Sequence, residues 1–160
     1  MTQNLWDIPD SWIWTTIGEI GKISSGSTPS TKDVTNFGGD YPWLTPADLS
    51  GFELKFIKRG KRNLTEKGLR SCSAKLLPAG TILFSSRAPI GYTVIASNPI
   101  STNQGFKNVT VHEGLFNEYV YHWLKGNKIL AEEFASGTTF KELSAKRMKM
   151  IPIPIPPFNE

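Results

Sequence analysis

Three charged side chains in the first third of the chain have the types and order of a metal-dependent nuclease site. Asp40 and the Glu-Leu-Lys run at 53–55 follow a pattern in which two carboxylates hold a divalent cation and a lysine orients the attacking water. However, Asp40 lies between a glycine pair and a Tyr-Pro pair, which indicates a loop instead of a strand end. A nuclease using Asp40, Glu53 and Lys55 therefore stays an alternative.

The other residue types that carry chemistry are isolated. His112, His122 and Cys72 share no metal-ligand spacing, so the sequence predicts no metal site. No glycine-rich nucleotide loop is present. The Ile-Pro-Pro-Phe run at 155–158 resembles the Pro-Pro-aromatic loop of amino-methyltransferases, but its first position lacks the hydrogen-bond acceptor that such a loop needs. We expect a chain that is not an enzyme and binds no cofactor.

Positive charge is concentrated in one segment. Residues 55–75 carry eight basic side chains and one acid, a net charge of +7, whereas the whole chain carries only +4. A basic patch on a near-neutral body is typical of a protein that binds a polyanion such as DNA. A non-catalytic protein-interaction module, with an incidental basic patch, stays a second alternative.

Within and around this segment, thirteen side chains are candidates for DNA contact. Arg59 and Arg62 could bond guanine O6 and N7 together, and the nearby lysines could contact phosphates. Arg87 follows two serines in a turn that could hold a phosphate. Asn103 and Gln104 are suited to adenine or, as we prefer, to bracing their own loop. The full set is Ser27, Thr28, Lys32, Lys58, Arg59, Lys61, Arg62, Arg87, Asn103, Gln104, Lys107, Thr138 and Lys141.

Loops and short strands must position most of these candidates. Strands are predicted at 12–17, 52–57, 81–84, 92–96 and 106–111, with a long loop at 24–40 and a helical turn at 43–49. Capping boxes beginning at Asn63 and Thr139 predict short helices to about 72 and 147. Apolar spacing predicts helices at 115–126 and 128–135. Trp12, Trp43 and Phe106 are expected in the core.

Strands therefore dominate the middle of the chain, and helices dominate its last third. This order predicts an α+β fold, with a twisted, mostly antiparallel sheet and helices packed toward the C-terminal part. Residues 1–150 are expected to form a single domain, followed by a proline-rich exit segment at 151–160 that favours extended structure. One cysteine and no apolar membrane segment favour a cytoplasmic setting without membrane contact.

Seven segments, taken together, resemble one known family. In chain order they are the Ile-Pro-Asp-Ser-Trp-Ile-Trp run at 8–14, the Ser/Thr/Gly loop at 25–30, Tyr-Pro-Trp-Leu-Thr-Pro-Ala-Asp-Leu at 41–49, Ser-Ser-Arg-Ala-Pro-Ile-Gly at 85–91, Ser-Thr-Asn-Gln-Gly-Phe-Lys at 101–107, Ala-Ser-Gly-Thr-Thr-Phe-Lys at 135–141 and the alternating Ile-Pro run from 151. Their order and spacing cover nearly the whole chain. They are similar to the target-recognition domain of Type I restriction–modification specificity subunits.

The resemblance implies sequence-specific binding of double-stranded DNA. In this family each domain recognises one half of a split site, and separate modification and restriction subunits carry out the chemistry. A spacer helix would begin where this chain stops. Because the family's domains recognise many different sequences while sharing these motifs, the base-specific contacts are expected outside them, chiefly at 31–40 and 51–75.

Overall fold

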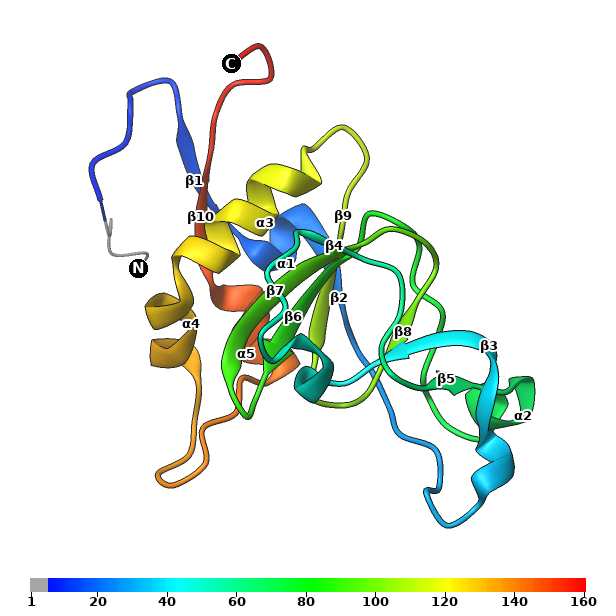
Figure 1. Ribbon diagram of the computed structural model, residues 1–160. Coiled ribbons are helices and arrows are strands. Elements are labelled where there is room, and N and C mark those ends of the chain that lie inside the picture. Colours follow the sequence, from blue (N-terminus) through cyan, green and yellow to red (C-terminus); the bar gives the residue numbers. More distant parts are fainter. Residues whose placement is uncertain (1–5) are drawn as a thin grey trace.

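The strands form three hydrogen-bonded sheets, of which the central one has five strands (Figure 1). The structure is a computed structural model that describes residues 6–160. In spatial order the five-stranded sheet consists of β2 (Gly21–Ser25), β9 (Lys107–Val111), β6 (Ile82–Ser86), β7 (Ile90–Ala96) and β4 (Phe56–Ile57). A three-stranded sheet follows the order β5 (Asn63–Leu64), β3 (Phe37–Leu44) and β8 (Ser101–Thr102). The third sheet pairs β1 (Ile13–Thr16) with β10 (Pro152–Ile155).

The central sheet is buried on both faces, as its middle strand shows. Alternate side chains of a strand point to opposite faces. Ile82 and Phe84 of β6 pack into one apolar cluster, whereas Leu83 packs into the other. All three side chains are fully buried. The sequence of β6 is therefore a continuous apolar run and not an alternation of apolar and polar residues.

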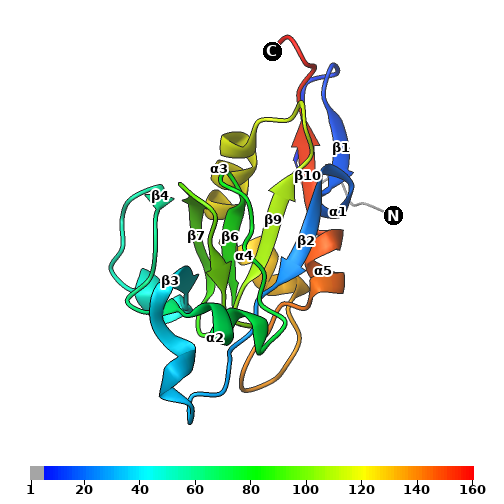
Figure 2. The same ribbon diagram turned by 90° about the vertical axis from the view of Figure 1, so that its right-hand side faces the viewer.

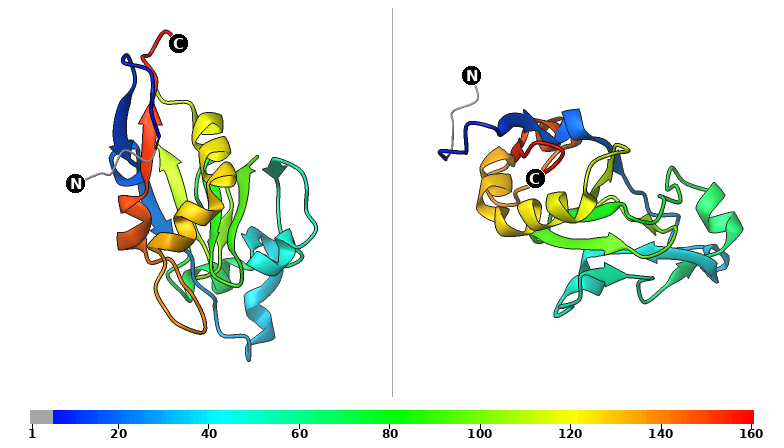
Figure 3. Two further views of the ribbon diagram at one scale, coloured as in Figure 1. Left: turned by 90° about the vertical axis from the view of Figure 1, so that its left-hand side faces the viewer. Right: turned by 90° about the horizontal axis from the view of Figure 1, so that it is seen from above.

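Helices cover one face of the central sheet, and the three-stranded sheet lies toward the other (Figure 3). The first cluster joins the sheet to α1 (Ile17–Ile20), α3 (Asn117–Gly126), α4 (Lys128–Phe134) and α5 (Ala145–Met150). The second cluster packs Leu83, Val94 and Phe106 against Leu44 and Leu49. Leu49 ends the 3-10 helix η2 (Pro46–Leu49), and Leu44 ends β3. A further helix, α2 (Glu66–Arg70), packs beside η1 (Val34–Asn36) and β3.

In the two-stranded sheet of β1 and β10, side chains of α3 occupy hydrogen-bonding groups on the outer edge of β10. Ile13 is opposite Ile155 and Thr16 is opposite Pro152, so the strands are antiparallel and adjacent (Figure 2). Prolines stand at alternate positions of β10 and have no N–H to donate. The carbonyl of Pro152 accepts a hydrogen bond from Trp123 Nε1 at 2.9 Å, and that of Pro154 accepts one from the Tyr119 hydroxyl. The predicted exit segment thus contributes a strand that packs against α3.

The predicted fold class is confirmed: the strands pair mainly antiparallel, and α3, α4 and α5 follow them in the C-terminal part. Only the β3–β8 and β4–β7 pairs are parallel among the described strands. The predicted loop at 24–40 was too long, because residues 21–25 form β2 against β9 and β3 begins at Phe37. A strand and not a helical turn occupies Trp43 and Leu44.

Both predicted capping boxes were wrong. Asn63 lies in β5 opposite Pro42, and the N-cap of α2 is Thr65, whose hydroxyl accepts from the Gly68 amide. Around the second box, Glu142 forms a β-bridge with Ser136, which prevents a helix from starting there. The helix α5 begins later, with Ser144 as its N-cap. In the first case a strand pairing, and in the second a local β-bridge, overrides the capping pattern.

Candidate nucleic-acid interface

Four loops lie together at one end of the central sheet. We call this region the loop end and define it as residues 26–33, 86–90, 103–106 and 136–142. The strand registers place the first three loops together, because Ser25 is opposite Lys107 and Ser86 is opposite Ile90. Figures 1 to 3 show the loop end on the side of the molecule away from the C-terminus. Each of the four loops overlaps one of the segments that carry the family resemblance.

Hydrogen bonds connect the four loops to one another. The Ser27 amide donates to the Thr102 carbonyl at 2.9 Å, and the Thr28 hydroxyl donates to Gln104 Oε1 at 2.5 Å. The Ser86 amide donates to the Gly105 carbonyl at 2.8 Å, and the Leu143 amide donates to the Ser86 carbonyl at 2.9 Å. These bonds link loops that are far apart in sequence.

The Asn103 side chain braces its own loop, which is the role we preferred. Its Oδ1 accepts from the Gly105 amide at 2.8 Å, and the backbone N–H of Asn103 donates to the Leu44 carbonyl at 2.9 Å. Gln104 is exposed and keeps its amide nitrogen free of hydrogen bonds to the described residues. Gln104 is consequently the better placed of the two amides to meet a ligand.

Trp43 joins the first loop to the basic segment. The indole is only 2% exposed, and its Nε1 donates to the Ser27 carbonyl at 3.1 Å. The Arg62 guanidinium lies over the Phe37 ring, at 4.5 Å from its centroid, and 5.7 Å from that of Trp43. Cation–π stacking of this kind fixes a guanidinium by its face and leaves its N–H edges free. The Lys61 amide is held nearby, donating to Asp48 Oδ1 at 3.1 Å.

The rest of the basic segment does not gather at the same place. Lys58 and Arg59 follow β4, whose Ile57 is opposite Ala96, at the end of β7 remote from the loop end. Lys55 forms an ion pair with Glu118 of α3 at 2.5 Å. Arg70 pairs with Glu66 one helical turn earlier, at 2.6 Å. The local charge of +7 is thus distributed over several faces and partly neutralised.

Lys67 ties the basic segment to the first loop through Asp33. Its Nζ lies 2.6 Å from Asp33 Oδ2 and 2.7 Å from the Thr35 hydroxyl. The hydrogen bonds from Lys67 and Thr35 lower the pKa of Asp33 to about 2. Both side chains of the pair are largely exposed, so salt screens their attraction. Lys32, next to Asp33, is exposed.

Lys107 lies beneath the loop end and not on it. Its side chain is 7% exposed, and its Nζ donates to the Ser86 hydroxyl at 3.4 Å. Burial lowers the pKa of Lys107, Glu142 opposes this shift, and Arg87 adds to it. Arg87 and Glu142 form an ion pair of 3.6 Å above it. This burial suits Lys107 to supporting the 86–90 turn from inside.

Thr138 and Lys141 are exposed on the 136–142 loop. Opposite this loop, across a hollow of about 580 Å³, lie Arg87 and the 88–90 turn. A second basic segment, which was not among the predicted DNA-binding segments, directly follows the loop. Residues 141–149 carry Lys141, Lys146, Arg147 and Lys149 against the single acid Glu142. The signal was present in the charge pattern, but it is shorter than the 55–75 segment.

The residues of the alternative nuclease site are not brought together. Asp40 lies on β3 in the three-stranded sheet, whereas Glu53 precedes β4 of the central sheet. Lys55 is engaged by Glu118. Within residues 6–160, no group of three or more His, Cys, Asp and Glu side chains could hold a metal ion.

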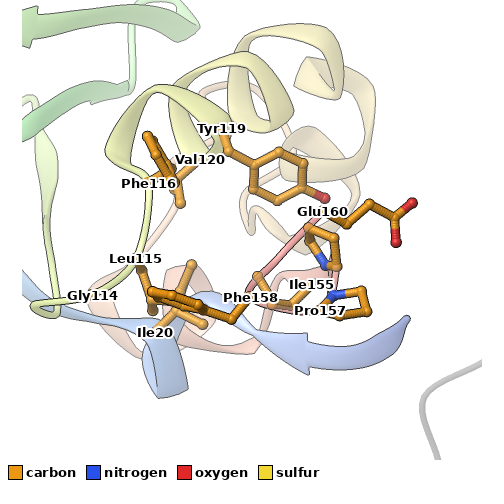
Figure 4. Close-up of a pocket in the computed structure, with 11 residues that line it drawn as sticks. Ile20, Gly114, Leu115, Phe116, Tyr119, Val120, Ile155, Pro157, Phe158 and Glu160 are labelled. Atoms are coloured by element: carbon orange, nitrogen blue, oxygen red, sulfur yellow. The ribbon is translucent and has the colours of Figure 1, made fainter. Parts of the chain in front are cut away.

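A smaller hollow lies near the C-terminus, at the other end of the molecule (Figure 4). It has a volume of about 230 Å³ and is lined by the start of α3 and the segment after β10. Leu115, Phe116, Tyr119 and Phe158 surround it, and Glu160 is its one charged lining residue. A hollow without a cation does not suit a polyanion, so the nucleic-acid candidate remains the loop end.

Comparison with known proteins identifies the family. The sequence profile of the Type I restriction modification DNA specificity domain matches residues 9–160. The chain belongs to this family. It is 47% identical over 152 residues to the specificity subunit of the Type I restriction enzyme MjaIX from Methanocaldococcus jannaschii, which covers 93% of this chain and 35% of that protein. It is 31% identical over 154 residues to the EcoR124I/EcoR124II specificity subunit from Escherichia coli, covering 92% of this chain and 37% of the relative.

Solved structures of the family have the same fold. A chain from a Type I restriction–modification assembly aligns with a TM-score of 0.75 and 23% identity, over 98% of this chain and 37% of that one. The HsdS subunit from Thermoanaerobacter tengcongensis aligns with a TM-score of 0.71 and 21% identity, over 99% and 36%. The chain therefore spans about a third of the length of its relatives.

Proposed function

We propose that the chain recognises a short sequence of double-stranded DNA with its loop end, as one half of a bipartite target. The observation that carries this proposal is membership of the DNA specificity domain family across residues 9–160. Four hydrogen-bonded loops supply a surface that the sheet holds in place. Loops on a rigid scaffold are a common location of binding residues.

The cations and amides of the loop end have separate roles in this proposal. Lys32, Arg87 and Lys141 bind phosphates, which supplies affinity and salt sensitivity without sequence information. Arg62, which lies beside the loop end and outside the shared motifs, contacts base edges, since a guanidinium matches guanine. Gln104, which lies within a shared motif, makes a polar contact that does not encode the target. Ser27, Thr28 and Thr138 line the approach to them. Lys58, Arg59 and Lys61 extend the phosphate contacts beyond the loop end.

The chain recognises DNA without catalysing a reaction. It acts as a specificity-subunit module, and modification and restriction subunits of a Type I complex supply methylation and cleavage. The separation of Asp40 from Glu53 weakens the nuclease alternative. No helix within residues 6–160 is both long and apolar enough to cross a membrane. The free thiol of Cys72 suits a reducing, cytoplasmic setting.

Selection from a randomised duplex library tests DNA recognition directly. The chain should enrich one short sequence, and its affinity for that duplex should fall steeply as salt is raised. Because one domain contacts only half of a split site, we expect affinities of about micromolar, near the range of non-specific binding. Enrichment of no sequence, with salt-insensitive or absent binding, would overturn the proposed function.

Co-purification with a modification subunit from the same host tests the assembly. The expected result is a complex that protects the selected duplex more strongly than the chain alone. The double Arg59→Ala/Arg62→Ala variant provides a matched control, because it should weaken DNA binding and leave subunit association intact. The variant and the parent are compared on the selected duplex and on a scrambled one. If the variant binds both duplexes as tightly as the parent does, the basic segment is only a solvated face.

A further inference from the structure

Phe140 is the most exposed apolar side chain of the loop end. It is 87% exposed and lies in the Thr-Thr-Phe-Lys run of the 136–142 loop. A single exposed apolar residue is ordinary on a protein surface. What distinguishes Phe140 is that backbone hydrogen bonds close its loop and that Arg87 and Lys141 line the same hollow.

Backbone pairing holds the loop that carries Phe140. Ser136 and Glu142 exchange amide–carbonyl hydrogen bonds of 3.1 and 2.9 Å, which close the loop at its base. Gly137 has a φ of +116°, and a Cβ there would lie 2.3 Å from the Phe140 carbonyl. After the loop, Leu143 is fully buried, and its amide bonds to Ser86. Phe140 therefore lies on a loop whose two ends are hydrogen-bonded to each other and anchored to the core.

The charges around Phe140 favour a polyanion. Glu132, the one carboxylate that lines the hollow, pairs with Lys128 at 3.7 Å, and Glu142, next to Lys141, pairs with Arg87 at 3.6 Å. Lys141 is exposed and forms no ion pair with the described residues. Lys146 and Arg147 are exposed on the first turns of α5, shortly after the loop. An apolar ring flanked by unpaired cations suits the space between two phosphate backbones.

We propose that Phe140 inserts as a wedge at a base-pair step of the bound duplex, with Lys141 on one flanking phosphate and Arg87, whose exposed 3.6 Å pair with Glu142 is weak, on the other. Apolar side chains that enter the minor groove in this way unstack a step and kink the DNA. This inference rests on the proposed function and deepens it. Sequence recognition would then depend on how easily the DNA deforms as well as on contacts to base edges.

Fluorescence of 2-aminopurine, placed in turn at each step of the selected duplex, tests the wedge. The parent chain should raise the fluorescence at one step, because unstacking relieves quenching, and energy transfer between end labels should report a bend. Phe140→Ala should abolish both signals and weaken binding by about tenfold, as loss of one base–aromatic contact predicts. Phe140→Leu should restore the signals, since leucine also serves as a wedge.

Phe158→Ala is the matched control, because Phe158 is 94% exposed but lies near the C-terminus. It should bind and bend DNA like the parent. The wedge is overturned if the parent binds the selected duplex without unstacking any step, or if Phe140→Ala matches the parent. It is also overturned if Phe140→Ala loses only association with a modification subunit. Failure of the parent to bind any duplex would instead remove the proposed function, and the wedge with it.

Discussion

Arg62 is the single residue from which we expect the sharpest effect on sequence recognition. Its guanidinium is stacked on Phe37 and directed by that stacking, which reduces the entropy lost on binding a base. Arg62→Ala should cost about 1–3 kcal/mol on the selected duplex and much less on a scrambled one. Arg62→Lys should fail equally, because lysine lacks the planar fork. Equilibrium binding to both duplexes measures this.

Arg59→Ala is the control for Arg62. Arg59 is exposed and follows β4 at the end of β7 remote from the loop end. Its loss should weaken all duplexes alike and reduce the salt slope by about 1. If Arg62→Ala also weakened binding to all duplexes alike, Arg62 would be assigned to a phosphate contact and not to a base contact.

The Asp33–Lys67 pair predicts a specific pH dependence. The folded pKa of Asp33 is about 2, below its ordinary value of 3.8. A depressed carboxyl pKa contributes stability that is present above the unfolded value and is lost as the pH falls toward 2. Lys67→Met should move the pKa of Asp33 upward, toward 3.8. NMR titration of the Asp33 carboxyl carbon measures the shift, and an unchanged pKa in the variant would contradict the pairing.

For single residues, the sequence predicted which side chains lie at the site better than it predicted which side chains they contact. Arg87 and Gln104 were candidates from their loop context, and both lie at the loop end. The Lys55–Glu118 pair joins positions 63 residues apart, and no local pattern indicates it. Lys107 lies in the strand predicted at 106–111, which β9 confirms, but its burial beneath Arg87 was not predicted. Burial of that kind depends on tertiary packing alone.

Among the elements, the junction between the first loop and residues 102–104 depends on one glycine. A Cβ on Gly26 would lie 2.0 Å from the Thr102 carbonyl oxygen and 2.2 Å from that of Asn103. Gly26→Ala should therefore push the two loops apart, destabilise the fold by about 1–3 kcal/mol and weaken DNA binding. Chemical denaturation and a binding titration measure the two effects.

Gly126→Ala is the matched control for this change. A Cβ on Gly126 meets no atom within 4 Å, and the residue ends α3. Its stability should stay the same or rise by about 0.4–1 kcal/mol, and its DNA binding should not change. Equal behaviour of Gly26→Ala and Gly126→Ala would show that the loop junction tolerates a shift.

The longer elements were predictable because their apolar patterns are strong. The helices at 117–126 and 128–134 begin and end within two residues of their predicted bounds. The strands β5 and β8 have two residues each and exist only because β3 lies between them. No intrinsic preference of a two-residue segment indicates such a strand, and β8 lies in a run that the sequence analysis left unassigned.

For the whole molecule, the two ends should respond differently to DNA. The loop end carries the cations and amides, whereas the hollow near the C-terminus is apolar. Hydrogen–deuterium exchange should show that DNA protects residues 26–33, 86–90, 103–106 and 136–142. The amides of residues 112–117 and of Phe158 should exchange at an unchanged rate. Protection confined to the apolar end would place the interface elsewhere.

The fold class could be predicted from the sequence, but the grouping of the four loops at one end of the sheet could not. Strand-rich and helix-rich thirds predicted α+β packing, and the motif series predicted the family, which the profile match confirms. The loop end, however, combines four segments spread over more than a hundred residues. Their contact follows from the registers of β2, β6, β7 and β9, which a single sequence does not specify.

The closed outer edge of β10 bears on how the chain behaves at high concentration. An open strand edge can template a strand from another molecule and so seed aggregation. In β10, Pro152 and Pro154 offer no donor, and Trp123 and Tyr119 already occupy their carbonyls. Pro154→Val with Tyr119→Phe would reopen one donor and one acceptor, and light scattering should then rise with protein concentration. The alternating prolines thus oppose self-association through the outer edge of β10.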